Sequence, residues 1–251
     1  MTDTVERFSN RVENYVKYRP HYPREIMPFL AENCGLTKES IIADIGCGTG
    51  ISSRLFLENG NRVIGVEPNA AMREAAVKYL AAFPWFQPVD GTSDDTTLRD
   101  SSVDFVVAAQ AFHWFKPDTT RAEFQRILKP GGHIALMWNE RHLDTTPFLV
   151  EYEAFLVKYA YDYGIVRHEN INAKDLRDFF KKEYGSVTFQ NVQIFDFDGL
   201  KGRMLSASYM PNETDAIFAE MIDELHSVFA KHAENDRIKV LYDTNVYFSR
   251  V

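Results

Sequence analysis

The sequence predicts an α/β fold: a doubly wound, mostly parallel seven-stranded sheet with an antiparallel edge strand and a helical lid. Strand-like apolar runs alternate with helix-like segments up to Trp138, which is typical of a parallel sheet covered by helices. A glycine-rich turn follows the first apolar run, and a long helical insertion separates the last two strand-like runs. The 251 residues, 45% of them hydrophobic, suffice for one core, so we expect a single domain.

The expected elements of the parallel part begin and end at helix-starting and helix-breaking residues. Pro68 and Asn69 begin a helix after the second strand, and the sequence Pro130-Gly131-Gly132 is expected to end the helix before the fifth strand. The expected strands are 41–45, 62–67, 85–89, 104–109 and 133–138, and the expected helices are 1–18, 24–34, 50–60, 69–82 and 118–128.

The pattern changes after Trp138. We expect helices at 146–163 and 173–182 and two final strands at 187–197 and 240–250. A helical insertion at about 200–233 lies between these strands, is interrupted at Tyr209, and is far too long for a tight hairpin turn. We expect it to form a lid over the ligand. The domain then divides into a core at about 36–140 and 185–251 and lid elements at about 1–25, 141–183 and 200–235.

Charge and composition exclude several classes of protein. The formal net charge of -8, without any run of lysine and arginine, argues against a nucleic-acid partner. No stretch approaches the roughly 18 apolar residues of a membrane span, and the first residues have no signal-peptide core. Cys34 and Cys47 offer no metal spacing. We therefore expect a cytoplasmic monomer or weak dimer that binds no metal, nucleic acid or membrane.

The turn after the first strand, Asp44-Ile-Gly-Cys-Gly-Thr-Gly50, indicates the class of ligand. Its glycines follow the pattern G-x-G-x-G, whereas a dinucleotide fingerprint has G-x-G-x-x-G. A carboxylate at Asp44 would repel a pyrophosphate but attract an ammonium or sulfonium group. The turn therefore favours a ligand with adenosine and cationic amino-acid ends, such as S-adenosylmethionine (SAM), over NAD.

Glu67 ends the second strand about 20 residues beyond this turn. An acid at that place can accept hydrogen bonds from ribose hydroxyls. Because SAM and NAD both carry an adenosine ribose, Glu67 alone does not separate them.

Four segments, in order, resemble the motifs of class I SAM-dependent methyltransferases, which implies a Rossmann-like fold. These segments are D-I-G-C-G-T-G (44–50), V-I-G-V-E-P-N (63–69), S-V-D-F-V-V-A-A-Q-A-F-H-W-F (102–115) and R-I-L-K-P-G-G-H-I-A-L (126–136). The segments Y-V-K-Y-R-P-H-Y-P, A-F-H-W-F and Y-D-T-N-V-Y further resemble the methyltransferase type 11 or trans-aconitate methyltransferase-like group. Members of that group methylate small molecules, including carboxylic acids.

The resemblance implies a role for each matching residue. Asp44 and the turn residues Gly46, Cys47, Gly48, Thr49 and Gly50 would hold the methionine end and the sugar, and Glu67 the ribose. Pro68, Met72, Thr92, Ser93 and Asp94 would lie near the adenine, although the family often has Ala-Glu at positions 93 and 94. Gln110 would lie beside the methionine part, and Arg19 or Tyr15 could pair with the SAM carboxylate.

Methyl transfer requires alignment of the acceptor more than chemical groups. His113 is the candidate general base and Trp114 a candidate pocket wall, with a capping or packing role as the alternative for His113. Arg141 and Arg203 could pair with an anionic substrate, although a solvated arginine is the favoured interpretation of each. We expect a SAM-dependent methyltransferase with a small-molecule acceptor, in which a carboxylate or hydroxyl receives the methyl group. The alternatives are a non-catalytic SAM-binding protein and an NAD-dependent oxidoreductase.

Overall fold

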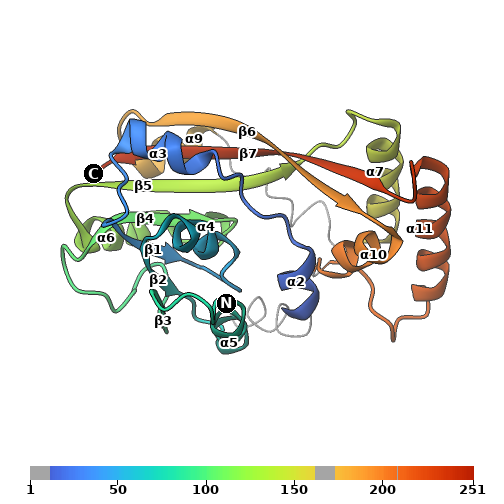
Figure 1. Cartoon of the computed structure of the whole chain (residues 1–251), viewed down its shortest axis with the longest axis horizontal. Coiled ribbons are helices and arrows are strands. Elements are labelled where there is room, and N and C mark those ends of the chain that lie inside the picture. Colours follow the sequence, from blue (N-terminus) through green and yellow to red (C-terminus); the bar gives the residue numbers. More distant parts are fainter. Residues whose placement is uncertain (1–11, 162–172, 208) are drawn as a thin grey trace. The chain divides into compact units, whose positions relative to one another are not determined.

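The computed structural model describes residues 12–161, 173–207 and 209–251 (Figure 1). They form a seven-stranded sheet of order β3-β2-β1-β4-β5-β7-β6. All neighbouring strands from β3 to β5 are parallel, which confirms the predicted doubly wound sheet. The strands are β1 Ile41–Ile45, β2 Arg62–Val66, β3 Phe86–Val89, β4 Val103–Ala109, β5 Leu128–Arg141, β6 Gly185–Phe195 and β7 Ile238–Arg250.

β7 runs antiparallel to β5. The amide of Val251 donates to the carbonyl of Gly132 (2.8 Å), and the amide of His142 donates to the carbonyl of Leu241 (2.9 Å). Residue numbers therefore rise along β5 as they fall along β7. The predicted antiparallel strand is thus confirmed at this end of the sheet, next to β6.

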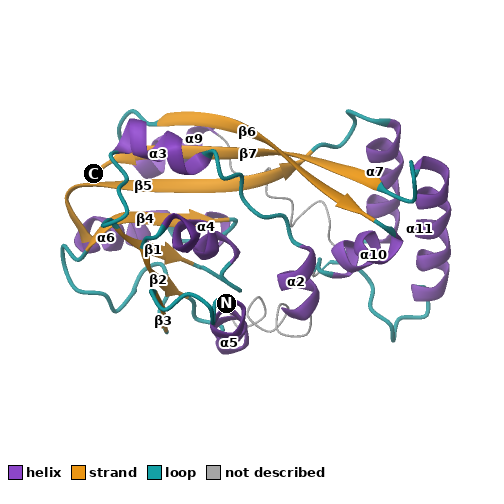
Figure 2. Cartoon of the chain, viewed as in Figure 1, coloured by secondary structure: helices purple, strands orange, loops and turns teal. Residues whose placement is uncertain are grey.

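The helices lie at the predicted segments, with ends that differ by a few residues; α10 begins at Phe197, before the predicted start of the insertion (Figure 2). Five of the described helices are α3 Ile26–Cys34, α4 Ile51–Asn59, α5 Ala70–Tyr79, α6 Pro117–Ile127 and α9 Ala173–Phe180. The others are α2 Val12–Tyr18, α7 Pro147–Tyr159, α10 Phe197–Leu205 and α11 Phe218–His232, with a short 3₁₀ turn η1 at Phe112–Trp114. Residues 1–11 of the predicted N-terminal helix lie outside the described residues.

Helix α6 ends at Ile127, one residue from its predicted end, but the predicted start of the fifth strand at His133 is wrong. Strand β5 already begins at Leu128, whose backbone is extended (φ -71°, ψ 136°), so the sequence Pro130-Gly131-Gly132 does not end the helix. The motif lies instead inside β5, where the pairing with β4 shifts register between Val103 and Phe105. Gly131 has φ +81°, a conformation that glycine adopts without strain, so the motif shapes a strand irregularity.

The chain divides into two compact units, each described by itself. Unit 1 comprises residues 1–20, 140–167 and 190–243, and unit 2 comprises 21–139, 168–189 and 244–251. In unit 2, helices α6 and α9 pack their apolar residues, such as Phe124, Phe179 and Phe180, on strand residues including Val106 and Leu136. This buried layer fixes the carboxyl ends of β1, β2 and β4, where ligands bind in such sheets.

Unit 1 has a core of its own. Apolar residues of α7, α10 and α11 pack against residues near the ends of β6 and β7, among them Phe155, Leu200, Leu225 and Val240. The predicted insertion is two helices, α10 and α11, and its interruption around Tyr209 is confirmed. That unit 1 acts as a lid, and that the two units work as one domain, stay predictions. Within the described part of the chain, no helix is long and apolar enough to cross a bilayer.

Candidate functional site

The turn between β1 and α4 in unit 2 needs its glycines. The amides of Gly46 and Cys47 both donate to the carbonyl of Val66 (2.8 and 3.2 Å), which ties the turn to β2. Gly46, Gly48 and Gly50 have φ values of +69°, +55° and +86°. Side chains strain the backbone in that region, so the alternating glycines follow from the conformation of the turn.

The three glycines differ in their surroundings. A Cβ at Gly46 would lie 2.8 Å from the Cβ of Ala111, and a Cβ at Gly50 would lie 2.6 Å from Cδ1 of Leu80. A Cβ at Gly48 would meet no atom of the described chain within 4 Å. Packing therefore accounts for two of the glycines, whereas Gly48 leaves open space beside the backbone that a ligand could occupy.

Asp44 is the penultimate residue of β1 and is completely buried. Its Oδ2 accepts hydrogen bonds from the hydroxyls of Ser52 and Ser53 (2.7 Å each), and its Oδ1 has no partner among the described residues. Burial raises the pKa of Asp44 to about 6, although the hydrogen bonds from the two serine hydroxyls favour the charged form and partly oppose this rise. Neither serine was predicted from the sequence, although two hydroxyl side chains in the first turn of the helix after the glycines were a usable signal.

Glu67 follows β2 and holds the adjacent backbone. Its Oε2 accepts from the amide of Gly48 and its Oε1 from the amide of Asn69, both at 2.9 Å. Burial raises the pKa of Glu67, although these backbone donors favour its charged form. Each carboxylate oxygen can accept a further hydrogen bond. Glu67 can therefore shape the turn and still bind a ligand hydroxyl.

Gln110 directly follows β4 with φ +54°, an uncommon value for a side-chain-bearing residue. Its Nε2 donates to the carbonyl of Asn139 (2.9 Å), while its Oε1 is buried without a partner in the described chain. The hydroxyl of Thr49 is also buried without one. Buried polar atoms destabilise a protein unless a ligand or water satisfies them. Asp44, Thr49 and Gln110 therefore fit a polar ligand at the ends of β1 and β4.

The other turn residues contribute less through their side chains. The thiol of Cys47 is buried and lies close to Gly65, where an added Cβ would be 2.9 Å from its Sγ. Burial raises the pKa of Cys47 well above its ordinary value, so the thiol is unreactive. Met72 is buried in α5, and Pro68 is exposed. Among these residues, Cys47 offers a ligand its backbone only.

The segment with Thr92, Ser93 and Asp94 is tied to unit 2 by polar contacts. The hydroxyl of Thr92 donates to Asp94 (2.8 Å), Asp94 lies 3.8 Å from Nζ of Lys116, and Ser93 accepts from the hydroxyl of Thr120 (3.0 Å). Asp94 is exposed. Its short side chain is already engaged, so its contact with an adenine stays a prediction.

Glu123 holds this segment in place, a role the sequence did not reveal. Arg126 pairs with its carboxylate, and the amide and hydroxyl of Thr96 donate to its Oε1 at 2.8 and 2.5 Å. These contacts lower the pKa of Glu123 to about 2, with Arg126 as the largest cause. Because the carboxylate is buried, its removal should destabilise the whole segment.

We expect Glu123→Gln to lower the free energy of unfolding by about 2 kcal/mol at pH 7. Because the pKa of this acid is depressed on folding, its contribution is present above about pH 4.5 and is lost as the pH falls toward 2. Urea unfolding at several pH values measures this. Asp100→Asn is the matched control, since Asp100 pairs with the same Arg126 but is exposed, and it should cost no more than about 0.5 kcal/mol. Equal losses for both variants would contradict the assigned role.

His113 and Trp114 lie in η1, shortly after β4. Their rings are 4.7 Å apart, and Trp114 is 44% exposed. Burial lowers the pKa of His113 to about 4, so the imidazole is neutral at pH 7 but a weak proton acceptor. Trp114 as a pocket wall and His113 as a base both stay predictions.

Tyr15 and Arg19 belong to unit 1. The guanidinium of Arg19 stacks over the ring of Tyr15 (4.8 Å) and donates to the carbonyl of Ser206 (3.0 Å). Its Nε is buried without a partner in the described chain. Arg19 thus keeps a free donor for an anion, and its pairing with the carboxylate of SAM stays a prediction.

The comparisons with known proteins agree with this geometry. The profile of a family described as a methyltransferase domain matches residues 43–136, the segment that carries the turn, Glu67 and Gln110. An uncharacterized methyltransferase-like protein of Schizosaccharomyces pombe is 28% identical, over 98% of this chain and 95% of that protein. An uncharacterized methyltransferase of Mycobacterium bovis is 35% identical over 53% of this chain, and the match spans about half (52%) of that relative.

Solved structures show the same fold. A putative type II methyltransferase from Anaeromyxobacter dehalogenans superposes with a TM-score of 0.64 at 22% identity, over 93% of this chain and 98% of that one. A putative methyltransferase from an antibiotic biosynthesis pathway of Anabaena variabilis has a TM-score of 0.61 at 20% identity, over 93% and 99%. Residues 43–136 thus carry a methyltransferase domain, and the methyltransferase relatives together with the shared fold support a SAM-dependent methyltransferase.

Proposed function

We propose that this enzyme binds SAM at the turn between β1 and α4 of unit 2 and transfers its methyl group to a small-molecule acceptor. The observation that carries the proposal is the set of buried polar atoms without a partner among the described residues: Oδ1 of Asp44, Oγ1 of Thr49 and Oε1 of Gln110. All three lie at or just after the carboxyl ends of strands, which form the ligand edge of a doubly wound sheet.

The residues of unit 2 suit the parts of this cofactor. The carboxylate of Asp44 attracts a cationic group, and Gly48 lets the backbone approach the ligand. Glu67 offers lone pairs to the ribose hydroxyls, and Gln110 offers an amide oxygen. Pro68, Met72 and the segment Thr92-Ser93-Asp94 would border the adenine. When bound, SAM supplies a methyl group on a sulfonium centre with a good leaving group.

The proteins of this class need an ordered site more than a strong base. Holding the acceptor close and aligned can contribute roughly 7–11 kcal/mol of barrier lowering. A carboxylate acceptor is already deprotonated at pH 7 and needs no base, whereas a hydroxyl acceptor is helped by one. Because the pKa of His113 is about 4, the site favours the carboxylate over the hydroxyl.

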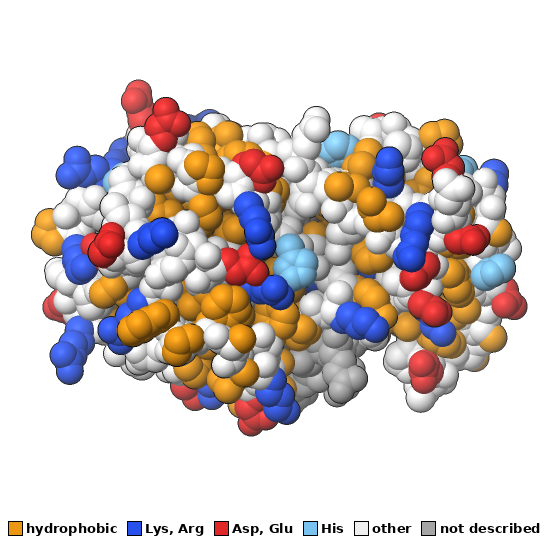
Figure 3. Space-filling model, in the orientation of Figure 1, with side chains coloured by type: hydrophobic (Ala, Val, Ile, Leu, Met, Phe, Trp, Pro, Cys, Tyr) orange, Lys and Arg blue, Asp and Glu red, His pale blue; other side chains and the backbone are white. Residues whose placement is uncertain are grey.

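The surface charge supports a small acceptor. The formal net charge is -8, and on the face drawn in Figure 3 the lysine and arginine side chains are scattered among acidic ones. That distribution lacks the basic stripe with which proteins follow nucleic-acid phosphates. We propose that the enzyme acts as a cytoplasmic monomer or weak dimer.

We expect the rate of methyl transfer to show no titration of His113 between pH 5.5 and 8, because a group with a pKa of about 4 is fully deprotonated there. His113→Asn should lower the rate while leaving the shape of the pH profile unchanged. Initial rates of S-adenosylhomocysteine formation measure both. A step with an apparent pKa near 6.5 that His113→Asn removes would show that the ring titrates as an ordinary catalytic base.

The function itself is tested with SAM labelled in its methyl group. The enzyme is incubated with a cell extract that has been separated into small molecules and macromolecules, and the label is traced in each fraction. We expect label in the small-molecule fraction, with equimolar S-adenosylhomocysteine. Label found only in protein or nucleic acid would contradict the small acceptor, and SAM binding without any turnover would indicate a non-catalytic SAM-binding protein.

A further inference from the structure

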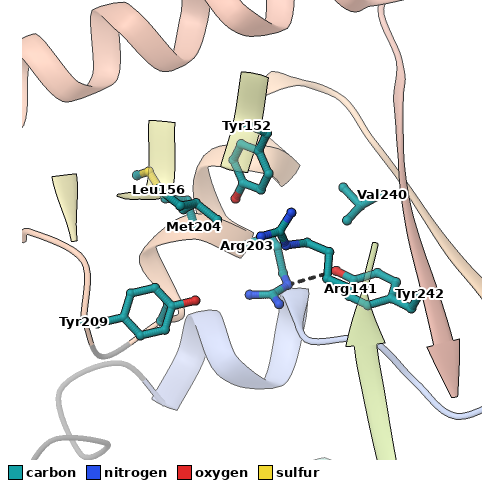
Figure 4. Close-up of a pocket in the computed structure, with 9 residues that line it drawn as sticks. Arg141, Tyr152, Leu156, Arg203, Met204, Tyr209, Val240 and Tyr242 are labelled. Atoms are coloured by element: carbon teal, nitrogen blue, oxygen red, sulfur yellow. Dashed lines mark hydrogen bonds between the residues drawn. The ribbon is translucent and has the colours of Figure 1, made fainter. Parts of the chain in front are cut away.

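Unit 1 contains a pocket of its own (Figure 4), formed by α7, α10 and the neighbouring parts of β5 and β7. It measures about 270 Å³ including its open mouth, and the side chains leave little free space inside. A narrow pocket of this kind suits a single polar group rather than a whole cofactor. Its lining residues are Arg141, Tyr152, Leu156, Arg203, Met204, Ala207, Tyr209, Val240 and Tyr242.

Arg203 is the central charge of this pocket. Its Nε donates to the hydroxyl of Tyr242 (3.2 Å) and its Nη1 to the hydroxyl of Ser206 (3.4 Å). No carboxylate of the described chain pairs with it. A half-buried guanidinium with only neutral partners is costly, because the Coulombic attraction that offsets desolvation is missing.

Two more guanidinium groups increase this positive charge. Arg141 lies beside Arg203 in the pocket (Figure 4). It also pairs with Glu153. Burial of Arg19 is the largest cause that lowers its pKa, and the positive charge of the nearby Arg203 is the second. Three guanidinium groups thus lie close together, and among the described residues no carboxylate pairs with Arg203.

Tyrosine hydroxyls complete the polar lining. Tyr152 is 3% exposed, and the guanidinium of Arg141 lies over its ring, 5.3 Å from the ring centroid. In Figure 4, the hydroxyls of Tyr152 and Tyr209 point toward the guanidinium groups of Arg141 and Arg203. The solvated interpretation that the sequence favoured for Arg141 and Arg203 is therefore wrong, because both line a polar pocket rich in hydrogen-bond donors.

We propose that this pocket of unit 1 binds an oxyanionic group of a small molecule, a carboxylate or a phosphate, with Arg203 and Arg141 as its main ligands. A guanidinium fork matches the two oxygens of either group, and the tyrosine hydroxyls can donate to the remaining lone pairs. The bound anion would offset the charge of Arg203.

The test is calorimetric titration of the full chain, at constant ionic strength, with succinate, with inorganic phosphate and with the neutral analogue succinamide. We expect succinate or phosphate to bind and succinamide not to bind, and the stronger of the two anions identifies the oxyanion. Arg203→Gln should weaken that binding about 10-fold or more, as expected for loss of a charge-assisted pair. Arg203→Lys keeps the charge without the fork and should give an intermediate affinity.

Lys201→Gln is the matched control, because it removes one positive charge from the same helix two residues away. It should change the affinity less than about 2-fold, as expected for a screened surface charge. Absence of binding by both anions would overturn the proposal. Equal effects of Arg203→Gln and Lys201→Gln would overturn it too, since that result indicates only a general charge effect.

A second measurement needs no variant and so covers the case in which Arg203→Gln fails to fold. Phenylglyoxal modifies accessible arginines, and mass spectrometry locates the sites. The oxyanion should slow modification of Arg203 and Arg141 but not of Arg237, an exposed arginine paired with Asp196. Unchanged modification of Arg203 would contradict the site. A parallel titration with SAM tests the proposed function separately. The oxyanion can bind to unit 1 even if SAM does not bind, and SAM can bind to unit 2 even if the oxyanion does not.

Discussion

Asp44→Asn should lower the affinity for SAM about 100-fold, or about 2.7 kcal/mol. The amide oxygen can keep the hydrogen bonds from Ser52 and Ser53, so the amide nitrogen would take the place of the partnerless Oδ1. That exchange removes a negative charge and presents a donor to a cationic group. Calorimetric titration with SAM measures the loss, with Glu74→Gln, on the exposed side of α5, as the control.

The same variant should change two pH dependences. Burial raises the pKa of Asp44 to about 6, so its carboxylate forms only as the pH rises through that value. The affinity for SAM should therefore increase with pH around 6 in the native enzyme and stay flat in Asp44→Asn. Stability should move the other way. Since the acid's pKa is raised on folding, the native enzyme should lose up to about 3 kcal/mol between pH 3.8 and 6, and the variant should not.

An unchanged affinity for SAM in Asp44→Asn would contradict the placement of the cationic end beside Asp44. A loss of affinity could also arise from unfolding of the variant, and circular dichroism at pH 7 tests for that. We expect Asp44→Asn to remain folded, because removing a buried charge relieves a desolvation cost.

Gly48→Ala should abolish most SAM binding while leaving the enzyme folded. The added Cβ meets no atom of the described chain within 4 Å, so stability should fall only by the ~1 kcal/mol of a side chain at positive φ. The methyl group would nevertheless occupy the open space assigned to the ligand, and the affinity should fall at least about 10-fold.

Gly46→Ala is the matched comparison. Its φ of +69° is similar, but its Cβ would lie 2.8 Å from the Cβ of Ala111, which cannot move without its backbone. We expect a loss of about 3 kcal/mol of stability, from backbone strain and overpacking together. Thermal unfolding and calorimetry on both variants measure this. If Gly48→Ala binds SAM as the native enzyme does, the open space beside Gly48 is not the cofactor site.

The sequence predicts the parallel half of this fold well because its signals are local. Apolar runs bounded by glycine, proline and capping residues mark β1, β2 and β4, and the spacing of Asp44, Gly46 and Glu67 follows from one strand–turn–helix unit. The boundary at Pro130 was wrong because β5 begins before the proline, in an irregular pairing with β4 that tertiary contacts determine.

The candidate site was predictable where one turn carries it and unpredictable where distant segments meet. Asp44 and Glu67 were found from their places at the ends of strands. The pairing of Glu123 with Thr96 joins residues 27 positions apart, and the meeting of Arg203 with Tyr242 joins residues 39 apart. Neither pair has a local pattern, and the lowered pKa of His113 comes from burial that one sequence does not reveal. That is why the arginine pocket and the weak basicity of His113 emerged only from the structure.

The most direct test of the central claim is calorimetric titration of the full chain with SAM, S-adenosylhomocysteine and NADH. We expect SAM and S-adenosylhomocysteine to bind at one site per chain and NADH not to bind, because the buried carboxylate of Asp44 attracts a cationic amino-acid end and repels a pyrophosphate. Binding of NADH in preference to SAM would contradict the assignment of the turn between β1 and α4, and with it the proposed methyl transfer.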